Sequence, residues 1–167
     1  RRRLIRPAGA ATLDPAPETR VLPAGISVVV PCYDSEATLG ELARRLAQVL
    51  PRLAERFELI LVNDGSSDRT WETIERLADD HDWVRGLDLM RNYGQHNATL
   101  CGVRAARYDV TVTLDDDLQN PPEEIPKLID SIGDADVIFG MPEDKQHSKY
   151  RNLGSLVVTS IMRIAFK

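Results

Sequence analysis

The sequence is poor in cysteine and aromatic residues and has no long apolar run, and each shortage excludes a class of protein. Two cysteines in 167 residues, Cys32 and Cys101, cannot form a disulfide framework, and they lack the spacing of a zinc site. We expect both to be reduced, as in a cytosolic protein. No stretch reaches the roughly 18 apolar residues of a membrane-spanning helix. The net charge of -5 argues against a nucleic-acid partner.

The two ends of the chain differ from its middle in composition. Residues 1–24 are rich in Pro, Ala and Arg and are predicted to be a flexible leader. Residues 25–148 have the apolar content of one globular core. In residues 149–167 apolar side chains recur at helical spacing beside basic ones, which predicts an amphipathic basic helix. Such a helix could lie on an anionic membrane surface or pack against a part of the protein that this chain lacks. Because the chain begins with Arg and this helix has no end signal, we expect a fragment of a longer protein.

Short apolar runs alternate with segments of helical periodicity through the middle of the chain. The runs predict five strands, at residues 26–30, 58–62, 84–90, 110–114 and 135–139. The intervening segments predict helices. This order is typical of an α/β fold, with a mostly parallel sheet and helices on both faces.

Three consecutive aspartates, Asp115, Asp116 and Asp117, follow the fourth predicted strand. Ligands bind at the carboxyl edge of such sheets, so the triplet is expected at a binding edge. Adjacent carboxylates repel one another, and a hard divalent cation would hold them together. Oxygen ligands favour Mg²⁺ or Mn²⁺ over zinc. The alternative is a charged turn that binds no metal.

Four loop motifs, at residues 31–34, 62–68, 91–94 and 115–123, occur in order after the predicted strands. Together they resemble the motif series of family 2 glycosyltransferases, whose GT-A fold is a Rossmann-like, mostly parallel sheet with helices on both faces. Among these enzymes the sequence is most similar to the branch that loads a sugar onto polyprenyl or dolichyl phosphate. The resemblance covers about residues 26–163.

The resemblance implies a binding role for the first two loops. Pro31, Tyr33 and Glu36 in the first loop and Asp64 in the second would hold the nucleoside of a sugar nucleotide. A base and ribose need a flat apolar surface and a carboxylate acceptor, which these residue types provide. Arg151 would meet a phosphate, although a solvated basic segment explains it equally well.

The same resemblance makes the aspartate triplet the catalytic element. Asp115 and Asp117 would bind the metal, with Gln119 reaching it as a further ligand. Asp116 would point away from the metal if the segment stays extended, because side chains alternate along a strand. It would then bind hydroxyls of the sugar or ribose.

The first loop departs from the family pattern. Its usual Tyr-Asn-Glu-Glu sequence becomes Tyr33-Asp34-Ser35-Glu36, so Ser replaces the first Glu. This change puts a carboxylate role at Ser35 in doubt.

We therefore expect an inverting glycosyltransferase that uses Mg²⁺ or Mn²⁺ to move a sugar from a nucleoside-diphosphate sugar to a polyprenyl phosphate. It would work at the cytoplasmic face of the membrane, contacting it through the basic helix and the missing C-terminal segment. A homo-oligomer is left open.

Three alternatives to this expectation would be distinguished by assays of sugar transfer. The first is transfer to a polysaccharide or another non-lipid acceptor. The second is a non-catalytic, Mg²⁺-dependent nucleotide-binding module. The third, a phosphatase of the Asp-x-Asp-x-Thr type, fits poorly because Gln119 stands where Thr is expected and the motif follows the fourth strand rather than the first.

Overall fold

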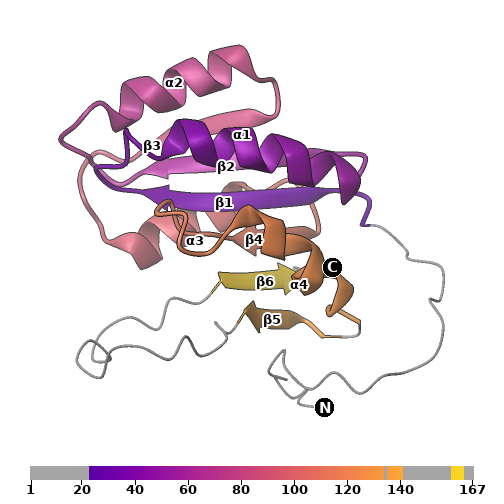
Figure 1. Ribbon diagram of the computed structural model, residues 1–167. Helices are drawn as coiled ribbons and strands as arrows, with labels where there is room; N and C mark the ends of the chain where they lie inside the picture. Colours follow the sequence, from indigo (N-terminus) through magenta and orange to yellow (C-terminus); the bar gives the residue numbers. More distant parts are fainter. Residues whose placement is uncertain (1–22, 134, 141–158, 164–167) are drawn as a thin grey trace, which may run out of the picture.

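The computed structural model of the protein describes residues 23–133, 135–140 and 159–163 (Figure 1). The strands are β1 (Ile26–Cys32), β2 (Phe57–Asn63), β3 (Val84–Asp88), β4 (Val110–Thr113), β5 (Val137–Gly140) and β6 (Thr159–Arg163). The α-helices are α1 (Leu39–Val49), α2 (Thr70–Asp80), α3 (Gln95–Ala105) and α4 (Ile125–Asp130). There are also two short 3₁₀ helices. The first, η1 (Leu50–Arg52), directly follows α1, and the second, η2 (Pro122–Glu124), directly precedes α4.

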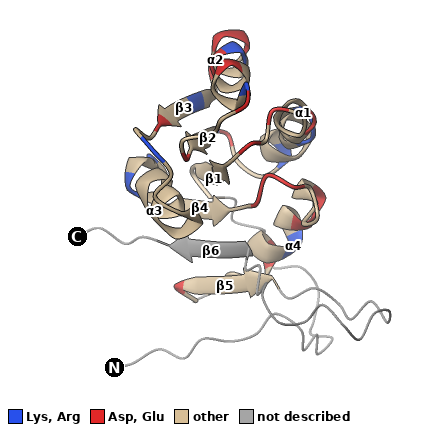
Figure 2. Ribbon diagram, turned by 90° about the vertical axis from the view of Figure 1, so that its left-hand side faces the viewer, with Lys and Arg blue, Asp and Glu red and all other residues tan. Residues whose placement is uncertain are grey.

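The strands form one sheet in the order β3-β2-β1-β4-β6-β5. Strands β3, β2, β1 and β4 are parallel to one another, whereas β6 is antiparallel to both β4 and β5. Figure 2 looks along the sheet and shows α1 and α4 on one side and α3 on the other. The predicted α/β architecture, a mostly parallel sheet covered on both faces, is confirmed.

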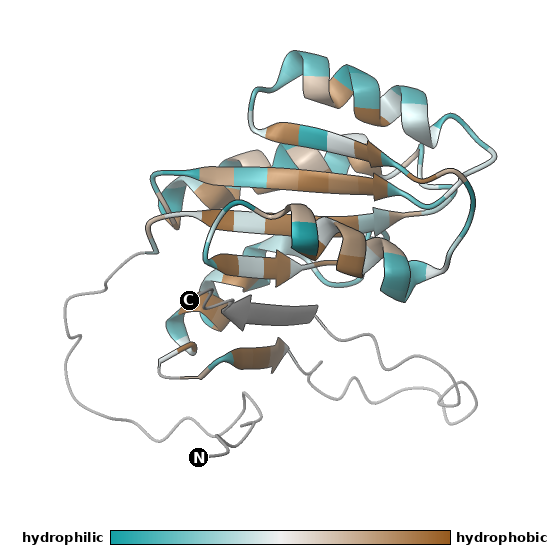
Figure 3. Cartoon of the chain, turned by 180° about the vertical axis from the view of Figure 1, so that it is seen from behind, coloured by the Kyte–Doolittle hydropathy of each residue, from teal (hydrophilic) through white to brown (hydrophobic). Residues whose placement is uncertain are grey.

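Two apolar layers hold the helices to the sheet. Successive side chains of a strand point to opposite faces, and β1 follows this rule. Val28 and Val30 belong to the larger layer beneath α1, α2 and α4, while Val29 belongs to the smaller layer with Ala98 and Val103 of α3. Every residue of β1 is buried, and Figure 3 shows the apolar character of the central strands. A strand covered on both faces reads as a continuous apolar run, which is why this one could be predicted.

A glycine lets α3 lie close to the sheet. A Cβ atom at Gly102 would stand 2.3 Å from Cγ1 of Val29 and 3.0 Å from Cγ2 of Val62. Glycine normally weakens a helix interior. Here its missing side chain permits the approach that seats the start of α3 at the carboxyl edge of the strands.

The prediction of a helix over residues 149–167 is wrong for the part of this segment that the structure describes. Residues Thr159–Arg163 form β6, which pairs with both β4 and β5. A strand inserted between two others gains hydrogen bonds on both sides, and these non-local bonds override the local helical periodicity. The predicted end of the core at residue 148 is therefore too early. Residues 149–158 and 164–167 lie outside the described part, as do the predicted leader up to residue 22 and Arg151.

Strand β1 continues past Pro31, where the sequence predicted its end. Pro31 pairs with Val62 of β2, and the strand ends at Cys32. The pairing of β4 with β1 ends at Val29, whose carbonyl accepts a hydrogen bond from Leu114 N–H. The nitrogen of Pro31 faces the same side as Val29, beyond this last pair. The missing N–H of the proline therefore falls where β1 is no longer paired with β4.

Candidate functional site

The carboxyl ends of β1, β2, β3 and β4 meet at one edge of the sheet, and the loops that follow them enclose a cleft of about 410 Å³. We call this the edge cleft. Its lining comes from the end of β1, the four loops and the first turn of α3: Pro31, Cys32, Tyr33, Asp64, Asn92, Gly94, Gln95, Asp115, Asp116 and Asp117. Six of these were predicted from the sequence as site residues, and the fold brings them together.

The aspartate triplet leaves the extended conformation directly after β4. The chain turns at residues 116 and 117, and Leu118 has a positive φ of 60°. Asp116 consequently faces the first loop, where one carboxylate oxygen accepts a hydrogen bond from the Ser35 hydroxyl. Asp115 accepts a hydrogen bond of 2.7 Å from the side-chain amide of Gln95. The strict alternation assumed for an extended segment therefore does not apply beyond Leu114.

The electrostatics of the triplet favour a cation. Burial raises the pKa of the Asp115 carboxyl, the negative charges of Asp117 and Asp116 raise it further, and the hydrogen bond from Gln95 opposes the shift. Ionised Asp115 is thus held at a cost that a nearby positive charge would offset.

The donor set fits a cation that protein and ligand hold jointly. Over the described residues, no three His, Cys, Asp or Glu side chains are grouped to bind a metal ion on their own. Mg²⁺ is commonly bound through one or two carboxylates, with substrate phosphates and water completing its shell. Asp115 and Asp117, both in the edge cleft, match this arrangement.

Asp64 organises the loop that follows β3. Its side chain is 2% exposed, and its two oxygens accept hydrogen bonds from the backbone N–H groups of Tyr93 at 2.7 Å and Gly94 at 2.8 Å. Hydrogen bonds to an ionised acceptor are stronger than neutral ones. Asp64 therefore fixes the residues immediately before α3, which begins at Gln95.

Gly65 brings the second loop against the third. It has a φ of +68°, and a Cβ atom there would stand 2.5 Å from the backbone nitrogen of Asn92. Only glycine fits both the conformation and the space. The loops are thus packed backbone to backbone beside the cleft.

Two other predicted site residues lie in the loops but not in the lining of the edge cleft. Glu36 accepts hydrogen bonds from the backbone and the guanidinium of Arg69, at 3.0 and 3.3 Å, and so ties the first loop to the second. Gln119 donates its backbone N–H to Asp117 at 2.9 Å. Its predicted role as a metal ligand stays a prediction.

Four residues that line the cleft had no role predicted from the sequence: Cys32, Asn92, Gly94 and Gln95. Gln95 is the most informative of them because it contacts Asp115 directly. Its only signal was its position, immediately after the third motif and at the start of a predicted helix. Burial raises the pKa of the Cys32 thiol, and the charge of Asp116 adds to this effect. The protonated thiol is consistent with a packing role.

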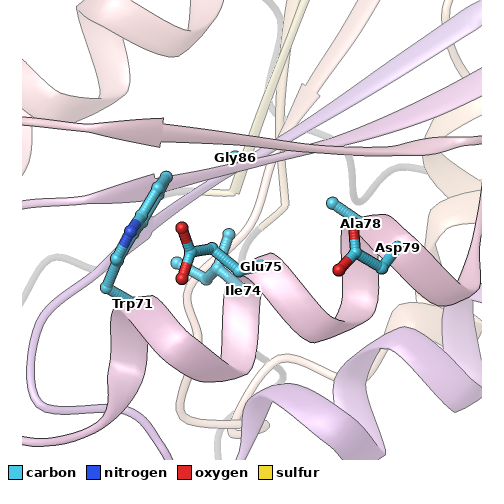
Figure 4. A pocket seen from close by; sticks show the side chains of 6 residues that line it. All are labelled: Trp71, Ile74, Glu75, Ala78, Asp79 and Gly86. Atoms are coloured by element: carbon cyan, nitrogen blue, oxygen red, sulfur yellow. The ribbon is translucent and has the colours of Figure 1, made fainter.

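A second hollow, of about 450 Å³, lies between α2 and the edge strand β3. Figure 4 shows Trp71 and Glu75 on the side of the helix that faces the strand carrying Gly86. This groove contains none of the four loop motifs, and its acids Glu75 and Asp79 are exposed. The chemistry is therefore concentrated in the edge cleft.

Comparison with known proteins identifies the family. The family model described as glycosyl transferase family 2 matches residues 27–163, which is most of the chain. The chain belongs to glycosyltransferase family 2. One relative of this family, an undecaprenyl-phosphate 4-deoxy-4-formamido-L-arabinose transferase of Pseudomonas aeruginosa (strain LESB58), is 44% identical over 135 residues. That match covers 80% of this chain and 40% of the relative. The chain thus spans about two fifths of the length of that relative.

Solved structures of glycosyltransferases share the fold. The mannosyltransferase PcManGT from Pyrobaculum calidifontis, in complex with GDP-Man and Mn²⁺, superposes with a TM-score of 0.66 at 20% identity. The match covers 80% of this chain and 39% of that one. Glucosyl-3-phosphoglycerate synthase from Mycobacterium tuberculosis, in complex with Mn²⁺, UDP and glucosyl-3-phosphoglycerate, matches 64% of this chain and 39% of its own, with a TM-score of 0.52 and 26% identity. The GT-A fold predicted for this family 2 chain is confirmed.

Within the part of the chain that the structure describes, no helix is both long enough and apolar enough to cross a membrane.

Proposed function

We propose that this chain is the donor-binding part of a glycosyltransferase that moves a sugar from a nucleoside-diphosphate sugar to a polyprenyl phosphate. The observation that carries the proposal is the edge cleft, in which exposed Tyr33 and the aspartate triplet face one space. A nucleoside needs a flat apolar surface, and a diphosphate needs neutralisation of its charge. The cleft offers the first at Tyr33 and a place for the second at Asp115 and Asp117.

Each loop would make one contribution to the reaction. Tyr33, 52% exposed at the mouth of the first loop, would lie against the base. Asp115 and Asp117 would hold Mg²⁺ or Mn²⁺. When bound, the cation would stabilise negative charge on the diphosphate leaving group. Gln95 would keep Asp115 oriented through its 2.7 Å hydrogen bond.

The acceptor assignment rests on the relative named above. That protein is named for transfer to undecaprenyl phosphate. A phosphate acceptor is anionic at neutral pH and needs little help from a general base to attack the sugar. Direct attack would invert the configuration at the anomeric carbon. Because the acceptor has a lipid tail, we propose that the longer protein works at the cytoplasmic face of the membrane. Contact through a basic C-terminal helix is not part of this proposal, since β6 occupies that region.

Calorimetric titration with UDP-, GDP- and dTDP-sugars tests donor binding. One nucleotide class should bind in the presence of Mn²⁺ and bind more weakly when the metal is chelated. Asp117→Asn should weaken Mn²⁺-dependent binding by at least about tenfold, roughly 1.4 kcal/mol, because it removes one metal ligand. Asp82→Asn is the matched control, since Asp82 is exposed and lies outside the cleft lining. If no member of the panel binds, the donor assignment fails.

The acceptor is tested with the longer protein. Sugar from the donor identified above should appear on undecaprenyl phosphate but not on undecaprenol, which lacks the attacking phosphate. Transfer to a polysaccharide instead would replace the lipid acceptor, and donor binding without any transfer would favour a non-catalytic module.

A further inference from the structure

Ser35 and Asp116 form a contact across the mouth of the edge cleft. Ser35 is 6% exposed, and its hydroxyl accepts a hydrogen bond of 3.0 Å from Tyr33 N–H while donating one to Oδ2 of Asp116. The same oxygen of Asp116 stands 3.4 Å from Tyr33 N. A hydroxyl has one hydrogen to donate and two lone pairs, so both bonds can form together.

The backbone of Ser35 is held as firmly as its hydroxyl. Its N–H donates to the hydroxyl of Thr70, at the start of α2, with a length of 2.7 Å. Its carbonyl accepts the N–H of Thr38 at 3.1 Å just before α1. Ser35 is therefore anchored between two helices, and Asp116, which comes from the turn after β4, is the partner that it orients.

We propose that Ser35 is a positioning residue that fixes the Asp116 carboxylate beside Tyr33, so that Asp116 serves the nucleoside side of the cleft while Asp115 and Asp117 remain for the cation. The inference rests on the proposed function, because it assigns parts of that same site. Two of the three adjacent aspartates thus have different hydrogen-bond partners: Gln95 holds Asp115, and Ser35 holds Asp116.

The contact places a single carboxylate at this point of the cleft. A second carboxylate at position 35 would face Asp116, and two like charges so close repel each other. The first loop lacks a carboxylate at Ser35, and Asp116 brings one to the same place from another loop. If the place of the charge matters more than the loop that supplies it, the carboxylate can be moved from residue 116 to residue 35.

A reciprocal rescue is therefore expected between residues 35 and 116. Asp116→Ala, which removes the carboxylate, and Ser35→Glu, which adds a second one, should each weaken nucleotide binding by about tenfold, the scale of one hydrogen bond to a charged group. The double variant Ser35→Glu/Asp116→Ala should bind more tightly than either single variant, as measured by calorimetry with Mn²⁺. Ser131→Ala is the control, because the Ser131 hydroxyl donates to the backbone carbonyl of Lys127 on α4, outside the cleft lining. Losses that simply add in the double variant overturn the proposal.

A second measurement does not depend on the ligand. Because Tyr33 N–H lies beside both Ser35 and Asp116, its amide resonance should shift in Ser35→Ala and in Asp116→Ala, although residue 116 is 83 positions away in sequence. Asp116→Asn keeps an oxygen that can accept the hydrogen bond from Ser35, so it should shift the Tyr33 resonance less than Asp116→Ala does. The Asn variant also provides the test if the Ala variant folds poorly. An unchanged Tyr33 resonance in Asp116→Ala overturns the positioning role. If the wild-type chain binds no nucleotide, the proposed function fails while this resonance still decides the contact.

Discussion

Replacing Asp115 with Asn is expected to stabilise the ligand-free protein and at the same time to remove its response to metal. Burial and the neighbouring aspartates raise the pKa of Asp115 in the folded state. A carboxyl group whose pKa is higher when folded than when unfolded lowers stability as pH rises through that interval, and the penalty is complete above the folded value. Asn carries no charge, and its oxygen can still accept the hydrogen bond from Gln95.

The gain should be small because the triplet is partly exposed. Removing repulsion between partly solvated like charges is worth about 0.5–1 kcal/mol in total. For a domain of this size, such a change raises the melting temperature by about 1–4 °C. The sign matters more than the size, since most substitutions lower stability.

Thermal unfolding at neutral pH with a chelator measures this effect directly. Asp115→Asn should melt above the wild type, and the difference should vanish in acid, where Asp115 is protonated. Adding Mn²⁺ with the bound nucleotide should raise the melting temperature of the wild type but hardly that of the variant. Asp82→Asn controls for the loss of a surface charge. A variant that melts below the wild type in chelator would refute the electrostatic reasoning.

Three further substitutions separate binding from stability. Tyr33→Ala should weaken nucleotide binding by about 1–3 kcal/mol, the usual value of base stacking. The melting temperature should change little because Tyr33 is exposed. A large loss of stability at normal nucleotide affinity would instead place Tyr33 in the core. Gly65→Ala should lower the free energy of unfolding in urea by at least about 1 kcal/mol, since its φ is +68° and a Cβ atom would meet Asn92; an unchanged midpoint would contradict the close packing of the loops. Buried Glu58 accepts hydrogen bonds from the Ser27 hydroxyl, the Arg85 guanidinium and the Arg107 backbone N–H. Glu58→Gln should therefore cost about 1–3 kcal/mol of stability, yet leave nucleotide affinity unchanged because β2 reaches the cleft only at its other end.

The sequence was sufficient for the parallel core and for the location of the site. Buried strands such as β2 are continuous apolar runs, and Asn63 and Asp64 mark the end of that run. Parallel pairing then places the loops after β1, β2 and β4 at the same edge of the sheet without any knowledge of side-chain contacts. Six predicted site residues line one cleft for this reason.

Features that depend on non-local contacts could not be predicted. Ser66 and Ser67 shortly precede α2, which begins at Thr70, but their hydroxyls do not cap it and instead donate to Asn63 at 2.6 Å and Asp34 at 3.2 Å. The same applies to β6, whose strand conformation depends on β4 and β5. Local propensity carries no information about a partner that is distant in sequence.

The loops of the edge cleft are joined by carboxylates, and this has a consequence for binding. Asp34 accepts the N–H of Ser67 at 2.7 Å, Asp64 accepts those of Tyr93 and Gly94, and Asp116 accepts the hydroxyl of Ser35. Each bond therefore joins a loop to one that follows or faces it. A cleft whose loops are already tied together loses less conformational entropy when a ligand binds. Asp64 illustrates the point, because both of its oxygens already accept backbone hydrogen bonds. Any nucleoside contact made by Asp64 must share those oxygens, so its larger contribution should come from holding Gln95, and through it Asp115, in place.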